Sequence, residues 1–114
     1  MIRERTRAGT LGAMALAALL FGAPRAFGQP EAQLVQEGRR LFIDAGCDGC
    51  HTIGKVGTQG MASDLSQVGA KYDRADLTKW LQDPAAQKPI AHMPKIELGK
   101  NEVAALAAYL SSMR

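Results

Sequence analysis

The chain has 114 residues, with 14 basic and 11 acidic side chains and a formal net charge of +3. This length leaves room for one domain at most. The basic excess lies in the first 28 residues, so it is no argument for nucleic-acid binding.

The start of the chain has the pattern of a secretory signal peptide. Three arginines precede residues 8–23, which carry no charge, and the small residues Ala26 and Gly28 suit a cut before Gln29. A membrane span needs about 20 apolar residues, and this run is shorter and interrupted by glycines. We therefore expect residues 1–28 to be cleaved rather than kept as an anchor.

The rest of the chain, residues 29–114, carries ten basic and ten acidic side chains and is formally neutral. Its 86 residues are few for a self-sufficient hydrophobic core. We expect it to form a single domain.

The first predicted helix covers about residues 31–45. Its apolar face is made by Leu34, Gly38, Leu41, Phe42 and Ala45. A glycine inside a helix costs about 1 kcal/mol relative to alanine. Gly38 therefore indicates a place where another helix approaches closely.

The stretch Cys47-Asp48-Gly49-Cys50-His51 is a C-x-x-C-H motif, which is typical of c-type haem attachment. Two thiols at this spacing can form thioethers with the two vinyl groups of one haem, and His51 is then placed to coordinate the iron. A haem bonded to both cysteines would also serve as a large apolar core element, in place of the disulfide common in small exported proteins.

Two other uses of a C-x-x-C pair are less well supported. A redox dithiol of the thioredoxin type needs a βαβ context, and alternating strand patterns are absent. A zinc site needs two further ligands, but only His92 remains outside the motif and there is no third cysteine.

Between the motif and the end of the chain, loops flank one predicted helix. Residues 52–61 contain three glycines and indicate a loop, and residues 64–68 predict one helical turn. Asp73 is a good N-cap for a helix over residues 74–82, which carries the only tryptophan, Trp80. Residues 83–99 lack helical periodicity and predict a loop.

The second axial ligand of a haem iron has four candidates: Met61, His92, Met93 and Met113. Met93 is favoured because Pro89 and Pro94 stiffen its loop and can hold a thioether at a fixed distance. The alternative use of Met93 is simple core packing.

The last predicted helix covers about residues 100–113. Its apolar face is made by Val103, Leu106, Ala107 and Leu110. It is the expected partner of the first helix.

Together these features resemble the class I monohaem cytochromes c, including small bacterial carriers and the cytochrome domains of terminal oxidases and nitric oxide reductases. The matching pieces are Gly38-x-x-x-Phe42, Cys47-x-x-Cys50-His51, Asp64-Leu65, Trp80-Leu81-x-Asp83-Pro84, Lys88-Pro89, Met93-Pro94 and Leu106-x-x-Tyr109. The resemblance implies an all-α fold in which the terminal helices cross, with a third helix and loops wrapped around one covalent haem c.

The resemblance also implies roles for single residues. His51 and Met93 would be the axial pair, and the Trp80 indole N–H would bond a haem propionate. The family usually has a proline whose carbonyl accepts a hydrogen bond from the ligand histidine, whereas Ser63 stands there in this chain. We expect that loop to be less rigid.

A His/Met pair fills both axial positions and raises the reduction potential, which is typical of an electron carrier rather than an enzyme. We expect a periplasmic protein that shuttles electrons between respiratory redox proteins, without nucleic acid or small-molecule substrate, and with membrane contact only through a partner complex or an uncleaved anchor. The alternatives are a gas-binding or peroxidase-like haem protein with an open sixth position, and a fixed haem subunit of a larger respiratory complex.

Overall fold

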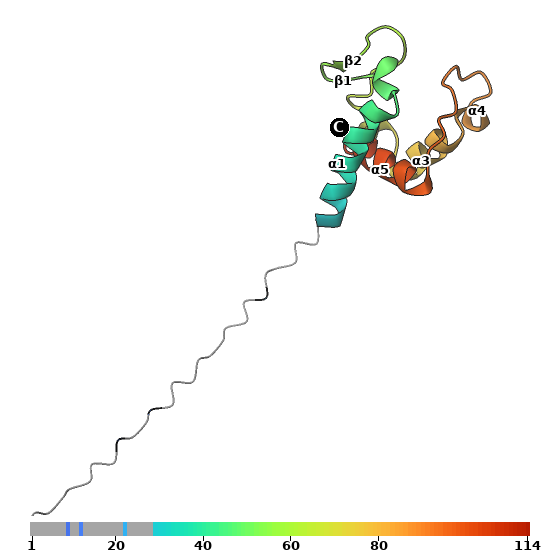
Figure 1. Ribbon diagram of the computed structural model, residues 1–114. Helices are drawn as coiled ribbons and strands as arrows, with labels where there is room; N and C mark the ends of the chain where they lie inside the picture. The colour runs from blue at the N-terminus through green and yellow to red at the C-terminus, as the bar shows by residue number, and fades with distance from the viewer. Residues whose placement is uncertain (1–8, 10–11, 13–21, 23–28) are drawn as a thin grey trace, which may run out of the picture.

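The computed structural model describes residues 29–114 together with Gly9, Gly12 and Gly22 (Figure 1). Apart from those three glycines, the predicted signal peptide of residues 1–28 lies outside the described residues. Within the described part of the chain, no helix is long and apolar enough to cross a membrane.

The described residues form a mainly helical structure with one very short antiparallel sheet. The elements in order are α1 (Gln29–Asp44), the 3₁₀ turn η1 (Cys47–Gly49), β1 (Thr52–Ile53), β2 (Val56–Gly57), α2 (Val68–Lys71), α3 (Arg74–Gln82), α4 (Pro84–Gln87) and α5 (Lys100–Ser111). In the sheet, Thr52 pairs with Gly57 and Ile53 with Val56. The predicted all-α fold and its two long terminal helices are confirmed.

The structure rests on the crossing of α1 and α5 (Figure 1). The backbone of α1 at Gly38 meets the backbone of α5 at Ala105 and the side chain of Tyr109. Beside this contact, the rings of Phe42 and Tyr109 pack edge to face, with centroids 6.2 Å apart. The predicted close approach at Gly38 is therefore confirmed.

The core around this crossing is built from one face of α1, one face of α3, most of α5 and the first residue of α2. Its buried members are Leu41, Phe42, Val68, Leu77, Leu81, Val103, Ala105, Leu106, Ala107, Tyr109 and Leu110. The alanines let α5 lie close to both other helices, and a mainly aliphatic, alanine-rich helix is also intrinsically favourable. The loops of the structure begin and end at the helices that form this core.

Helix α3 has the bounds that the sequence predicts, because a side-chain cap marks its start and a proline follows its end. The Asp73 carboxylate accepts a hydrogen bond from the Asp76 N–H at the first turn. The helix ends at Gln82 because Pro84 follows. Its buried side chains Leu77 and Leu81 pack it onto the core.

Two expectations about the short elements differ from the structure. Residues 65–68 close one turn, in which the Val68 amide donates to Leu65 O at 3.1 Å, but the helix, α2, runs from Val68 to Lys71, because Asp64 pairs with Thr52 of β1 instead. The segment predicted as loop from residue 83 contains α4, which the Asp83 side chain caps and the buried Pro84 begins. A four-residue helix is too short to show periodicity in a sequence.

Two arms extend from the helix pair in Figure 1. The hairpin arm, residues 45–67, contains η1, β1 and β2 and follows α1. The distal arm, residues 83–99, contains α4 and joins α3 to α5. The haem motif lies on the first arm and Met93 on the second.

We predict that Gly38→Ala destabilises the protein by about 2 kcal/mol or more in the free energy of unfolding. A Cβ at position 38 would overlap Ala105 O and lie 2.6 Å from Tyr109 Cβ, and such overpacking outweighs the helix propensity gained. Denaturant unfolding of the haem-loaded protein measures the loss.

The matched control is Gly99→Ala at the N-cap of α5. A Cβ there meets only the flexible end of Glu102, at 3.2 Å, so we expect a loss below about 1 kcal/mol. Equal losses in the two variants would contradict the backbone contact at Gly38.

Candidate haem site

The C-x-x-C-H motif folds as a tight turn after α1. The amide of Cys50 donates to Cys47 O at 3.2 Å and the amide of His51 donates to the same oxygen at 2.9 Å. Neither cysteine forms a disulfide; Cys47 is half-buried against the core and Cys50 is exposed. Side chains three apart in a 3₁₀ turn lie on one side, which suits two bonds to a single flat ligand.

The environment of Cys47 does not suit a redox dithiol. Burial raises the pKa of the Cys47 thiol, with a smaller contribution from the charge of Asp48. A reactive dithiol instead needs a lowered pKa so that thiolate is present at neutral pH. The half-buried sulfur fits better as a point of covalent attachment.

The ring of His51 is oriented by one hydrogen bond, because its Nδ1 lies 2.7 Å from the backbone carbonyl oxygen of Ser63. A carbonyl only accepts, so Nδ1 carries the proton. The lone pair of Nε2 is then free to bind a metal. Ser63 thus supplies the contact expected of a proline, since any residue has the carbonyl.

The segment around Ser63 is held against β1. The amide of Leu65 donates to Thr52 O at 2.8 Å, and the amide of Gly54 donates to Ser66 Oγ at 2.8 Å. Ser66 also donates from its amide to the Asp64 carboxylate at 2.8 Å. These bonds restrain the loop that we expected to be loose, and they fix the acceptor for His51.

Gly57 supports His51 in a way that the sequence did not reveal. Its φ of +103° is unfavourable for other residues. A Cβ at this position would collide with the carbonyl of His51, against which Gly57 packs directly. The glycines of residues 52–61 signalled only a loop, since the contact depends on how the hairpin folds back.

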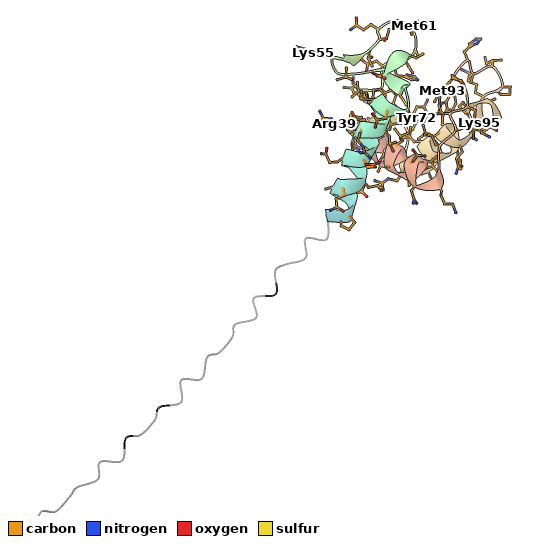
Figure 2. All side chains as sticks on the ribbon, in the orientation of Figure 1. Arg39, Lys55, Met61, Tyr72, Met93 and Lys95 are labelled. Carbon is orange, nitrogen blue, oxygen red and sulfur yellow. The ribbon has the colours of Figure 1, made fainter. Side chains whose placement is uncertain are left out.

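Met93, the predicted second ligand, lies on the distal arm. It is half-buried against the core, and Figure 2 shows it on the arm opposite to Lys55 and Met61. By contrast Met61 is 68 % exposed, and His92 is exposed. Met113 lines a separate hollow between α1, α5 and the hairpin.

Trp80 on α3 forms a hydrogen bond with Met93. Its indole Nε1–H donates to Met93 Sδ at 3.2 Å, in a partly buried position. The N–H predicted to bond a haem propionate is therefore engaged with the thioether in this structure.

A hollow of about 470 Å³ adjoins the loop that holds His51, a size common for small-molecule sites. Its lining consists of Ser63, Asp64, Leu65, Ser66, Gln67, Val68, Lys71 and Tyr72. Among the described residues, no group of three or more His, Cys, Asp or Glu side chains is arranged to hold a metal ion. The two thiols and the imidazole of the motif fit the attachment of a haem c, and they lack the further ligand that a four-coordinate zinc site needs.

Comparison with known proteins agrees with this donor set. The family model described as Cytochrome c matches residues 35–114, which is more than half of the chain. The chain belongs to the cytochrome c family. Membership implies a covalently bound haem c, and cytochrome c domains typically carry electrons rather than catalyse reactions. They are commonly extracellular or periplasmic.

One curated relative of this cytochrome c-family chain is cytochrome c oxidase subunit 2 of Alkalihalophilus pseudofirmus. The two are 30 % identical over 94 residues, which cover 75 % of this chain and 28 % of the relative. The chain therefore matches less than a third of that protein's length. No solved structure shows a significant match.

We predict that Ser66→Ala raises the pKa of Asp64 toward its usual value. Hydrogen bonds from the Ser66 hydroxyl and then from its amide hold the pKa of Asp64 below that value, and the variant removes the hydroxyl. NMR titration of the haem-loaded, reduced wild type and variant measures the change.

The sign of the pH effect follows from this lowered pKa. The stabilising contribution of ionised Asp64 is fully present above its unfolded pKa of about 4, and is lost as the pH falls through the lower folded pKa. The wild type should therefore lose more stability than Ser66→Ala on acidification from about pH 5. An unchanged pKa of Asp64 in the variant would contradict the hydrogen bond from the Ser66 hydroxyl to the Asp64 carboxylate.

Proposed function

We propose that this protein carries single electrons between larger respiratory redox proteins, outside the cytoplasm. It would do so with one haem c, attached through Cys47 and Cys50 and ligated by His51 and Met93. The iron of such a haem alternates between the ferric and ferrous states. The chain itself fixes the ligands and limits solvent access.

The observation that carries this proposal is the placement of Met93. A protein that binds gases or peroxide needs an open or easily exchanged sixth position. Here a thioether is half-buried against the core and is bonded to Trp80, which belongs to a capped helix. A ligand restrained in this way favours electron transfer over binding of an external molecule.

The proposed ligands come from segments that the core holds independently. His51 is fixed within the hairpin arm by the carbonyl of Ser63. Met93 is fixed from α3 through Trp80. If both residues ligated a haem iron, these hydrogen bonds would help to hold them in place, and a small rearrangement favours fast electron transfer.

We predict that Met93→Ala abolishes the weak red absorption band of methionine–iron ligation in the oxidised protein. It should also lower the reduction potential, because the thioether raises it. Absorption spectra of both oxidation states and a redox titration measure these changes.

Met61→Ala is the matched control, since Met61 is 68 % exposed on the opposite arm. It should keep the band and the potential. A wild-type protein without the band, or a Met93→Ala variant that retains it, would refute the ligand assignment. The gas-binding alternative would be favoured if the wild type lacks the band and binds carbon monoxide readily.

The similarity to an oxidase subunit favours a second candidate, in which the protein is a haem module held on a larger complex. If it is a free carrier, we expect the haem-loaded protein in the soluble periplasmic fraction, with the native mass of a single cleaved chain. Cell fractionation followed by native mass measurement tests this. Quantitative recovery with a membrane complex would support the fixed module instead.

A further inference from the structure

The side chain of Ser66 joins the turn of the β1–β2 hairpin to the segment that contains Ser63. Its Oγ accepts a hydrogen bond from the amide of Gly54 at 2.8 Å and donates one to the Asp64 carboxylate. Gly54 lies in the two-residue turn between β1 and β2. A single hydroxyl therefore connects the hairpin turn with the loop that bonds His51.

The Asp64 carboxylate holds this hydroxyl in one orientation. Its Oδ1 accepts hydrogen bonds from the amide of Ser66, at 2.8 Å, and from the hydroxyl of the same residue. Because the hydroxyl proton is engaged there, the oxygen presents a lone pair to the N–H of Gly54. Hydrogen bonds to a carboxylate are stronger than those between neutral groups, so the orientation is well defined.

The connection affects His51 because the acceptor of its hydrogen bond lies only three residues before Ser66. His51 Nδ1 lies 2.7 Å from the carbonyl oxygen of Ser63. Within residues 29–114, the Ser63 amide donates no hydrogen bond. The position of this carbonyl is therefore set by the neighbours of Ser63 along the chain.

Two attachments hold those neighbours against the hairpin. The first is the backbone bond from the Leu65 amide to Thr52 O, at 2.8 Å. The second is the bond from the Gly54 amide to Ser66 Oγ, two residues further along the hairpin. One attachment would let a short segment pivot, whereas two fix its direction and with it the direction of the Ser63 carbonyl.

We propose that Ser66, oriented by Asp64, is a positioning residue for His51 and holds the Ser63 carbonyl at hydrogen-bond distance from the ring N–H. A carbonyl held in this way makes the imidazole a stronger donor to a bound metal, which favours the more positive oxidation state. Ser66 acts only through Ser63. This inference rests on the proposed function in taking His51 as an axial ligand.

The first experiment replaces Ser66 by Ala, which removes the hydroxyl and leaves every charge in place at neutral pH. We expect the reduction potential of the haem-loaded protein to rise, because a weaker bond to His51 makes the imidazole a poorer donor. In the reduced, diamagnetic protein, the Nδ1 proton of His51 should exchange with solvent about fivefold faster. A merely structural role for Ser66 predicts lower stability with the potential and the exchange rate unchanged.

Asp73→Ala is the matched control for lost stability. It also removes a carboxylate that accepts a backbone amide, but at the first turn of α3. The exchange rate of the His51 ring proton should stay at its wild-type value. An increase equal to that in Ser66→Ala would overturn the inference, because the effect would then follow from destabilisation alone.

Ser63→Pro supplies a rescue. Proline keeps the carbonyl that His51 needs and stiffens the backbone at that residue, and the φ of Ser63 is not positive. Added to Ser66→Ala, it should return the potential and the exchange rate toward their wild-type values. If Ser63→Pro alone matches the wild type but the double variant stays at the Ser66→Ala values, the inference is overturned.

The outcomes separate the two proposals. A wild-type spectrum without the methionine–iron band refutes the proposed function, whereas the exchange of the His51 ring proton still tests the role of Ser66. If the band is present but Ser66→Ala leaves the potential and the exchange rate unchanged, or lowers the potential, the inference alone is overturned. A higher potential with faster exchange, both reversed by Ser63→Pro, supports it.

Discussion

Gly38 allows the backbones of α1 and α5 to touch, and the rest of the fold depends on this contact. Because the helices meet so closely, the rings of Phe42 and Tyr109 and the small side chains of α5 fill a core in a short chain. A domain of this size buries a limited share of its surface. A small number of core residues at the crossing therefore holds both arms. A haem can complete the core between chain segments that are far apart in sequence.

Much of this arrangement was predictable because the signals are local. Helical periodicity and the Asp73 cap predicted the ends of the long helices to within two residues, and the C-x-x-C-H spacing predicted a covalent haem c, which membership of the cytochrome c family also implies. The four-residue helix α4 carries too little periodicity to be recognised. The helix expected at residues 64–68 begins only at Val68, because Asp64 and Leu65 are held by Thr52 of β1, a tertiary contact that overrides local preference.

The site contains details that sequence alone does not specify. The Ser63 carbonyl could be anticipated only as an available acceptor, since every residue has one, and the hydrogen bonds that hold it come from the folded hairpin. The contacts of Gly57 and Trp80 are likewise not specified by the sequence. The residue type of Gly57 suggested only a loop, and the family resemblance suggested a propionate contact for Trp80, whereas their contacts with His51 and Met93 depend on how the arms return to the core.

The two hydrogen bonds at the proposed ligands come from different parts of the fold. The carbonyl of Ser63 accepts from His51 within the hairpin arm, and such a bond would make the imidazole a stronger donor to a bound metal. The indole of Trp80 on α3 donates to Met93 of the distal arm. Because one bond lies within the hairpin arm and the other anchors the distal arm to α3, a substitution that removes one bond leaves the other in place. Both arms depend on the same α1–α5 crossing, so the core that keeps the fold also sets where the two proposed ligands lie.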